Sequence, residues 1–152
     1  MGVRVLIVDD ESYIRELIRE TLRGRQYSAG TAANGVEALD ILSREAFDIV
    51  VTDVVMPGME GLELVKQIRR QYPGVRIIVL TGYPRSADIG DFLAQGVDEF
   101  LPKPFRANDL LAVIKRLEQK IAASGGGAPG TGGPGAGATG PGGAPKGKGS
   151  PA

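Results

Sequence analysis

Short apolar runs recur along the first part of the chain, and a segment with helical spacing follows each of them. The run Ile49-Val50-Val51 contains only β-branched residues and no alternating polar position. Such a run is typical of a strand that a parallel sheet buries on both faces. Further runs predict strands at residues 3–8, 27–32, 76–80 and 99–101, and the run at 27–32 is the weakest of them.

The segments between these runs have the spacing of amphipathic helices. The first has apolar-face positions in an i, i+3, i+4, i+7, i+8 pattern: Ile14, Leu17, Ile18, Thr21 and Leu22. Ser12 is a candidate N-cap for this helix. The later helices are marked by Val36, Leu39 and Leu42; by Leu64, Val65, Ile68 and Tyr72; by Ile89, Phe92 and Leu93; and by Leu110, Ile114, Leu117 and Ile121. This alternation predicts an α/β fold, a doubly wound five-stranded parallel sheet with helices on both faces.

Residues 124–152 differ in composition from the rest of the chain. They consist mainly of Gly, Pro and Ala and contain no large apolar side chain. Such a segment cannot bury enough apolar surface to offset the entropy that it would lose on ordering. We therefore expect one folded domain of ordinary size over residues 1–123, able to bury a core, and a disordered tail or linker over residues 124–152.

The charge and the residue inventory narrow the classes of function. The chain has 18 basic and 18 acidic residues, so its overall charge gives no reason to expect direct nucleic-acid binding. It contains no Cys, which excludes disulfides and thiolate chemistry, and no His, which excludes a phosphohistidine within the chain. The amino terminus lacks a signal-peptide pattern, and no apolar run approaches membrane-spanning length. These observations predict a cytoplasmic protein without membrane contact.

Acidic residues stand where two of the predicted strands end. Asp9 and Asp10 follow the first strand, and Asp53 follows the third. The carboxyl ends of parallel strands share one edge of the sheet, and ligands bind at that edge in open α/β folds. Three carboxylates at one edge repel each other unless a cation lies between them, and Mg²⁺ prefers oxygen ligands of this kind. The pattern predicts a site for Mg²⁺ (or Mn²⁺).

Two further strand ends bring a hydroxyl and an ammonium group to the same edge. Thr81 follows the fourth strand and Lys103 follows the fifth. A metal, a lysine and a hydroxyl around a carboxylate meet the needs of phosphoryl transfer, in which the protein positions the group and neutralises its charge. Asp53 is the candidate nucleophile, because aspartyl phosphate is an established covalent intermediate. Each residue taken singly could instead be an ordinary turn or loop residue.

The strand-end residues form an ordered set of motifs: Asp9-Asp10, Asp53 followed by Met56-Pro57-Gly58, Thr81, and Lys103-Pro104. With this set, residues 3–121 resemble the receiver domain of bacterial two-component response regulators, including the chemotaxis regulators. Each motif alone is weak, but the complete set at the matching strand ends is specific. The resemblance implies a flavodoxin-like sheet with the strand order 2-1-3-4-5.

The resemblance implies a role for each residue at the acidic edge. Asp53 would be the phosphoacceptor, and Lys103 would contact its carboxylate and then the phosphoryl group. The metal ligands would be Asp10, Asp9 (directly or through water), Asp53 and the main-chain carbonyl of Val55. Asp53, Lys103 and Thr81 would thus carry the phosphoryl-transfer chemistry.

The resemblance also implies switch and tuning positions. Thr81 would move to bond a phosphoryl oxygen, and Phe100 occupies the switch-aromatic position. This position is often Tyr; Phe keeps the packing but cannot make a hydroxyl hydrogen bond. Val55 and Tyr83 fall where family members vary and tune phosphate loss, and neither offers an acid or amide to orient an attacking water.

The partners follow from the same resemblance. A sensor histidine kinase or phosphotransfer protein would supply the phosphoryl group, an unknown downstream protein would respond, and the family allows a phosphorylation-dependent dimer. The chain would catalyse only the phosphorylation and dephosphorylation of its own Asp53. One alternative is a degenerate receiver that acts as a docking module without phosphorylation. Another is a metal-dependent phosphatase with an aspartyl nucleophile, although such enzymes usually have a D-x-D spacing, whereas Asp9 and Asp10 are adjacent.

The peptide bond between Lys103 and Pro104 is expected to be cis. The Lys103 ammonium must point back to the acidic edge although its strand runs outward, and Pro102 and Pro104 restrict φ on both sides. A cis bond reverses the chain locally and costs only ~0.5–1 kcal/mol before Pro. Receiver domains, which the chain resembles, commonly have a cis bond at this position.

Overall fold

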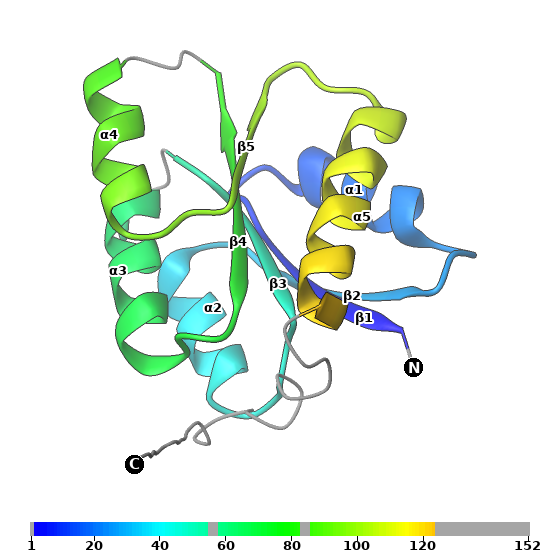
Figure 1. The fold of residues 1–152 in the computed structure, drawn as a ribbon, viewed down its shortest axis with the longest axis horizontal. Helices are drawn as coiled ribbons and strands as arrows, with labels where there is room; N and C mark the ends of the chain where they lie inside the picture. The colour runs from blue at the N-terminus through cyan, green and yellow to red at the C-terminus, as the bar shows by residue number, and fades with distance from the viewer. Residues whose placement is uncertain (1, 55–57, 83–85, 124–152) are drawn as a thin grey trace.

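The computed structural model describes residues 2–54, 58–82 and 86–123 and has the predicted order of strands and helices (Figure 1). The strands are β1 (Val3–Val8), β2 (Tyr27–Ala32), β3 (Ile49–Asp53), β4 (Arg76–Thr81) and β5 (Glu99–Pro102). The helices are α1 (Ser12–Leu22), α2 (Gly35–Leu42), α3 (Gly61–Gln71), α4 (Ser86–Ala94) and α5 (Ala107–Ala123). None of these helices has the length and apolar character needed to cross a membrane. The predicted tail, residues 124–152, lies outside the described residues.

The strands form one parallel sheet in the order β2-β1-β3-β4-β5, which confirms the predicted fold and strand order. The chain builds β2 on one side of β1 and then crosses to the other side to build β3. The register pairs Val8 of β1 with Thr52 of β3, so the next residues, Asp9 after β1 and Asp53 at the end of β3, lie side by side. The crossover between β1 and β3 therefore creates the acidic edge.

Side chains that alternate along the strands divide the core into two layers. In β1, Leu6 and Val8 face the layer that α2, α3 and α4 cover, whereas Val5 and Ile7 face α1 and α5 (Figure 1). All residues of the run 49–51 are fully buried, as expected for a strand covered on both faces. Burying one such side chain contributes about 1.5–3 kcal/mol, so these two layers are the main source of stability.

The helix starts follow local sequence only in part. At α2, the Asn34 side chain accepts a hydrogen bond of 2.8 Å from the Glu37 N–H, and the Glu37 carboxylate accepts one of 2.7 Å from the Ala33 N–H. At α1, the prediction of Ser12 as the N-cap is wrong. Ser12 is the first helical residue, and Glu11 takes the N-cap position without a side-chain capping bond.

Three residues that helical spacing assigned to apolar faces lie at the surface. Val36 of α2 is 64% exposed, Leu93 of α4 is 56% exposed, and Leu17 of α1 is 37% exposed. Helical spacing identifies the apolar face, but the angle at which a helix packs on the sheet decides which side of that face is covered. The exposed Leu93 places an apolar side chain on the outer surface of α4.

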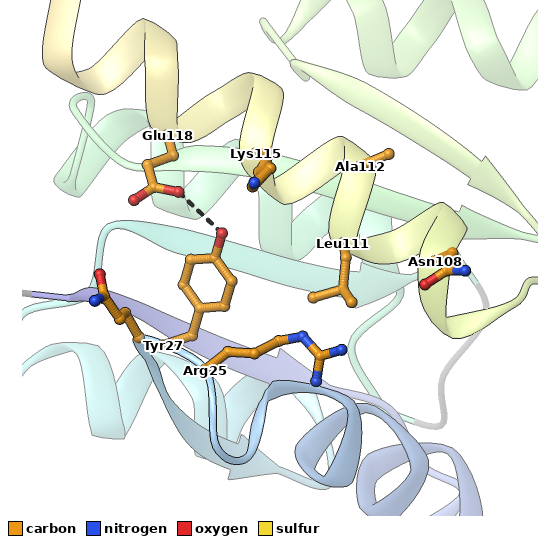
Figure 2. Close-up of a pocket in the computed structure, with 8 residues that line it drawn as sticks. Arg25, Tyr27, Asn108, Leu111, Ala112, Lys115 and Glu118 are labelled. Atoms are coloured by element: carbon orange, nitrogen blue, oxygen red, sulfur yellow. Dashed lines mark hydrogen bonds between the residues drawn. The ribbon is translucent and has the colours of Figure 1, made fainter.

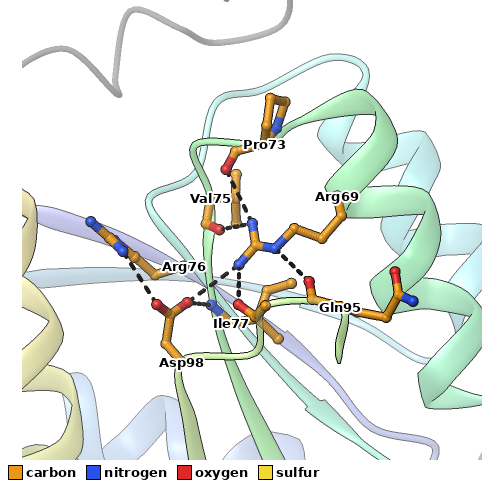
Figure 3. A network of polar contacts seen from close by, with 8 residues as sticks. Arg69, Pro73, Val75, Arg76, Ile77, Gln95 and Asp98 are labelled. Atoms are coloured by element: carbon orange, nitrogen blue, oxygen red, sulfur yellow. Dashed lines mark hydrogen bonds and ion pairs between the residues drawn. The ribbon is translucent and has the colours of Figure 1, made fainter. Parts of the chain in front are cut away.

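Arg69 of α3 ties together the amino ends of β4 and β5, opposite the acidic edge (Figure 3). Its guanidinium donates at 2.6–3.2 Å to four main-chain carbonyl oxygens, those of Pro73, Val75, Gln95 and Gly96. It also contacts the Asp98 carboxylate at 3.3 Å, and that carboxylate accepts further bonds from Ile77 N–H and Arg76. One side chain thus joins α3 to the turns that precede β4 and β5.

A groove of about 690 Å³ lies between α5 and the turn that leads into β2 (Figure 2). Arg25 and Tyr27 line one side, and Leu111, Lys115 and Glu118 of α5 line the other. The Tyr27 hydroxyl donates a hydrogen bond of 2.9 Å to the Glu118 carboxylate. This bond fastens the first residue of the edge strand β2 to α5.

Candidate functional site

Three carboxylates meet at the carboxyl edge of the sheet. Asp9 and Asp10 follow β1, Asp53 ends β3, and one oxygen atom of each lies within 4.8 Å of the other two. Asp9 is fully buried, Asp53 is partly buried and Asp10 is exposed. The cluster therefore has a buried floor and an opening to solvent.

Main-chain N–H groups and one ammonium hold two of the carboxylates. Oδ1 of Asp9 accepts a bond of 2.9 Å from the Glu11 N–H, and Oδ1 of Asp53 accepts one of 2.7 Å from the Val54 N–H. The Lys103 ammonium donates to Oδ2 of Asp53 at 2.9 Å and lies 3.6 Å from Oδ2 of Asp9. Oδ2 of Asp9 is buried and accepts no hydrogen bond from the described residues. A buried acceptor of this kind is costly unless a cation or water completes it.

Lys103 reaches the acids from the turn that follows β5. Its main-chain N–H donates a bond of 2.8 Å to the carbonyl oxygen of Thr81, which holds the end of β5 beside the end of β4. The Lys103–Pro104 peptide bond is cis, which confirms the prediction. The Lys103 side chain is 22% exposed, so its charge acts in a partly desolvated site, where it interacts more strongly than at an open surface.

Burial and neighbouring charges shift two of the ionisable groups. Burial raises the pKa of Asp9, and the charges of Asp53 and Asp10 add to this shift. The Glu11 N–H and the Lys103 ammonium oppose it. Burial alone would lower the pKa of Lys103, but the hydrogen bond to Asp53 and the nearby carboxylates raise that pKa overall. The raised pKa of Lys103 reflects the negative charge gathered at this edge, and a bound cation would offset both that charge and the cost of burying the Asp9 carboxylate.

The donor set fits a hard divalent cation. Carboxylate oxygens are the preferred ligands of Mg²⁺ and Mn²⁺. Three carboxylates face a single ammonium among the described residues of this cluster, and Oδ2 of Asp9 has no donor there. An open side at Asp10 leaves room for water or a phosphoryl oxygen beside the cation.

Thr81 and Phe100, the two predicted switch residues, lie on the neighbouring strands β4 and β5. Thr81 ends β4 one residue beyond Leu80, the register partner of Asp53, and is 6% exposed. Phe100 of β5 is partly buried against the core layer of α3 and α4. Its ring meets the ring of Phe92 edge-on, with a centroid distance of 6.2 Å and an interplanar angle of 86°. A displacement of Phe100 would therefore act directly on α4.

Some predicted positions cannot be placed, and one contact was missed. Val55 and Tyr83 lie outside the described residues, so the carbonyl ligand and the tuning positions stay predictions. The missed contact is made by Arg15, whose Nη1 donates to the main-chain carbonyl of Asp9 at 2.6 Å. Its only signal in the sequence is a basic residue in the turn of helix that follows Asp9-Asp10, which many surface helices share.

Comparison with known protein families agrees with this geometry. The family model described as "Response regulator receiver domain" matches residues 5–115, well over half of the chain. The chain belongs to this family. The matched range includes the acidic triad, which is typical of the Mg²⁺ site of a receiver domain. Membership implies two-component signalling with a cognate histidine kinase, and a receiver domain is typically a signalling module rather than a true enzyme.

Individual relatives show the same similarity. The response regulator MprA of Mycobacterium sp. (strain KMS) is 39% identical over 126 residues, which cover 83% of this chain and 55% of MprA. The chain thus spans about half the length of the curated relatives it matches. The solved structure of the chemotaxis response regulator CheY4 of Vibrio cholerae has a TM-score of 0.73 at 36% identity and covers 77% of this chain and 99% of its own. The BeF3-activated receiver domain of DrrB, from Thermotoga maritima, has a TM-score of 0.72 at 29% identity, with 78% and 99% coverage.

Proposed function

We propose that this receiver domain accepts a phosphoryl group on Asp53 from a phosphohistidine of a sensor kinase or phosphotransfer protein. The observation that carries the proposal is the contact of 2.9 Å between Lys103 Nζ and Asp53 Oδ2, beside the carboxylates of Asp9 and Asp10. The phosphohistidine belongs to the partner, because this chain contains no His. The phosphorylated form then binds a downstream protein differently from the unmodified form.

The transfer uses one carboxylate oxygen of Asp53 as the nucleophile. A P–O bond forms to this oxygen while the P–N bond of the donor phosphohistidine breaks, and the electron pair stays on the imidazole nitrogen, which takes up a proton from solvent. The product on this chain is an aspartyl phosphate. The Val54 N–H and the Lys103 ammonium fix the two oxygens of Asp53, so the carboxylate meets the donor in one orientation.

Charge neutralisation is the second requirement of the reaction. Asp9, Asp10 and Asp53 would hold Mg²⁺, which when bound would neutralise charge on the carboxylates and on the phosphoryl oxygens. Lys103 supplies a further positive charge, and its raised pKa keeps it protonated throughout the neutral range. The ammonium that bonds Asp53 before transfer would bond a phosphoryl oxygen afterwards.

The response to phosphorylation would run from Thr81 to α4. The Thr81 hydroxyl would bond a phosphoryl oxygen, and the shift of β4 against β5 would move Phe100. Because the ring of Phe100 touches that of Phe92, this movement would alter the surface of α4 on which Leu93 is exposed. The read-out would be steric, since Phe100 has no hydroxyl group.

Intact-mass measurement tests the proposal. After incubation with acetyl phosphate and Mg²⁺, the chain should gain the mass of one phosphoryl group, and without a divalent cation it should gain none. Asp53→Asn should abolish the adduct, whereas Asp40→Asn, at an exposed acid of α2, should leave it unchanged. An adduct that persists in Asp53→Asn would disprove the assignment of Asp53. A wild-type chain that never forms the adduct would favour a docking module without phosphorylation.

A further inference from the structure

Arg15 of α1 reaches back to the turn that carries the two adjacent acids. Its Nη1 atom donates to the main-chain carbonyl oxygen of Asp9 at 2.6 Å, and the side chain is partly buried. Among the described residues, no other group donates to this oxygen. A charge-assisted hydrogen bond of this length is among the stronger contacts that a main-chain carbonyl makes.

The carbonyl that Arg15 holds belongs to the peptide unit between Asp9 and Asp10. The other polar groups of Asp9 are bonded as well. The Asp9 N–H donates to the Ala32 carbonyl at 3.2 Å, and Oδ1 of Asp9 accepts from the Glu11 N–H at 2.9 Å. Asp9 is therefore held at its N–H and its carboxylate by main-chain groups, and at its carbonyl by a side chain. The orientation of the following peptide unit depends on Arg15.

Asp10 depends on this restraint more than Asp9 does. Its side chain is exposed and makes no hydrogen bond or ion pair with the described residues of the protein. Two peptide units therefore set the direction in which its carboxylate leaves the chain: the preceding one, which Arg15 holds, and the following one, whose Glu11 N–H bonds Oδ1 of Asp9. A rotation of the preceding unit would carry Asp10 away from the carboxylates of Asp9 and Asp53.

Arg15 does not hold the acidic side chains directly, and its positive charge would repel a bound cation. Within the described part of the chain, the Asp9 carboxylate pairs with Lys103 and not with Arg15, which bonds only to the main chain. A positive charge near a cation site weakens cation binding by Coulomb repulsion. Removal of the Arg15 charge should thus strengthen cation binding if electrostatics decides, and weaken it if the hydrogen bond to the carbonyl decides.

We propose that Arg15 is a positioning residue for the divalent cation: it fixes the Asp9–Asp10 peptide unit and so keeps the Asp10 carboxylate in the triad. The inference rests on the proposed function, because it takes the triad to be a cation site. Loss of a partner that orients a metal ligand typically weakens metal binding by about 10- to 100-fold. We expect a loss near the lower end, about tenfold, because Arg15 acts through the main chain.

Titration with Mn²⁺, followed by the electron paramagnetic resonance signal of the free ion, tests the inference without any phosphorylation assay. The wild type should bind one Mn²⁺. Arg15→Met should bind it about tenfold more weakly, and Arg15→Lys, which keeps a donor and the charge, should recover part of the loss. Arg19→Met is the matched control: it removes the same charge one turn further along α1, from a side chain that bonds Thr31 rather than the acidic turn, and it should bind as the wild type does.

The arms of this titration separate the two proposals. If Arg15→Met binds Mn²⁺ as tightly as the wild type, or more tightly, the positioning role is wrong and the cation site still stands. Equal losses in Arg15→Met and Arg19→Met would also overturn it, since they would trace the effect to α1 as a whole. A wild-type chain that binds no Mn²⁺ would overturn the cation site itself and the inference with it. Thermal midpoints without metal show that the variants compared are folded.

Discussion

The Nζ atom of Lys103 lies 2.9 Å from Oδ2 of Asp53, although 50 residues separate them in the sequence. Asp53 ends β3 and Lys103 follows β5, and these strands are not neighbours, because β4 lies between them. Lys103 crosses the end of β4 while its main-chain N–H bonds the Thr81 carbonyl. The same ammonium lies 3.6 Å from the Asp9 carboxylate, beyond β3. One side chain thus spans the carboxyl ends of four adjacent strands.

Replacement of Lys103 with Met should lower the free energy of unfolding by about 2 kcal/mol at neutral pH without divalent cations. The variant leaves the buried Asp9 and the partly buried Asp53 without their ammonium partner. Mg²⁺ should stabilise the variant more than the wild type, because no ammonium competes for the carboxylates. Urea unfolding with and without Mg²⁺ measures both effects, and Lys66→Met, at an exposed position of α3, is the control. Wild-type stability of the metal-free variant would contradict this account.

A chain that ends at residue 123 should keep the thermal midpoint of the full chain. Residues 124–152 contain no large apolar side chain, so their removal takes nothing from the core. A loss of ~1 kcal/mol would shift the midpoint of such a domain by roughly 4 °C, which calorimetry resolves easily. A chain that ends at residue 116 is the contrasting variant, since it loses the fully buried Leu117 and should unfold at a much lower temperature. A fall of several degrees in the first variant would move the domain boundary beyond residue 123.

The hydroxyl of Tyr27 should titrate with a pKa of about 12, compared with 10.0 for an unperturbed tyrosine. Burial of the ring and the hydrogen bond to Glu118 both favour the protonated form. As the pH rises from 10 toward 12, the unfolded chain loses this proton first, so the stability that the group contributes is complete below pH 10 and is lost over that interval. The difference in tyrosinate absorbance between the wild type and Tyr27→Phe gives the pKa directly. Glu118→Gln should lower it, and a pKa near 10 in the wild type would contradict both the burial of the hydroxyl and its bond to Glu118.

The sheet and the acidic edge could be predicted because they follow from short-range patterns and one topological rule. Apolar runs such as 49–51 mark strands buried on both faces, and parallel strands bring their carboxyl ends together. Asp9 and Asp53 could therefore be placed at the same edge, and the strand order implied by the resemblance to receiver domains placed them side by side. The cis bond before Pro104 followed from the need to turn Lys103 toward them.

The contacts of the long basic side chains could not be predicted in this way. Arg15 and Arg69 both bond main-chain carbonyls, and every residue offers such an acceptor, so residue type and spacing do not identify the partner. The exposure of Val36 and Leu93 could not be predicted either, because it depends on how their helices lie on the sheet. Ser12 failed as an N-cap because the helix begins one residue earlier than the capping preference suggests.

Replacement of Arg69 with Met should lower the free energy of unfolding by about 3 kcal/mol, since it leaves the partly buried carbonyl oxygens of Val75 and Gln95 without this donor and removes one of the donors to Asp98. Arg69→Lys should recover only a small part of this loss. A lysine keeps the charge, but a compact ammonium cannot reach acceptors spread around a planar guanidinium (Figure 3). Arg70→Met, at the neighbouring exposed position of α3, should be nearly neutral and controls for the loss of charge.

Arg69 acts at the amino ends of β4 and β5. Its replacement should therefore leave the arrangement of the acidic edge unchanged as long as the chain is folded. Mn²⁺ binding by Arg69→Met, measured well below its unfolding transition, should therefore match that of the wild type. Urea unfolding supplies the stability of each variant and the Mn²⁺ titration supplies the affinity. If Arg69→Lys restored the full stability, the positive charge, and not the several N–H donors of the guanidinium, would hold this end of the sheet. Weakened Mn²⁺ binding in the folded variant would show that the two ends of the sheet are coupled through α4, β4 or β5, which the separate contacts of Arg69 and Lys103 argue against.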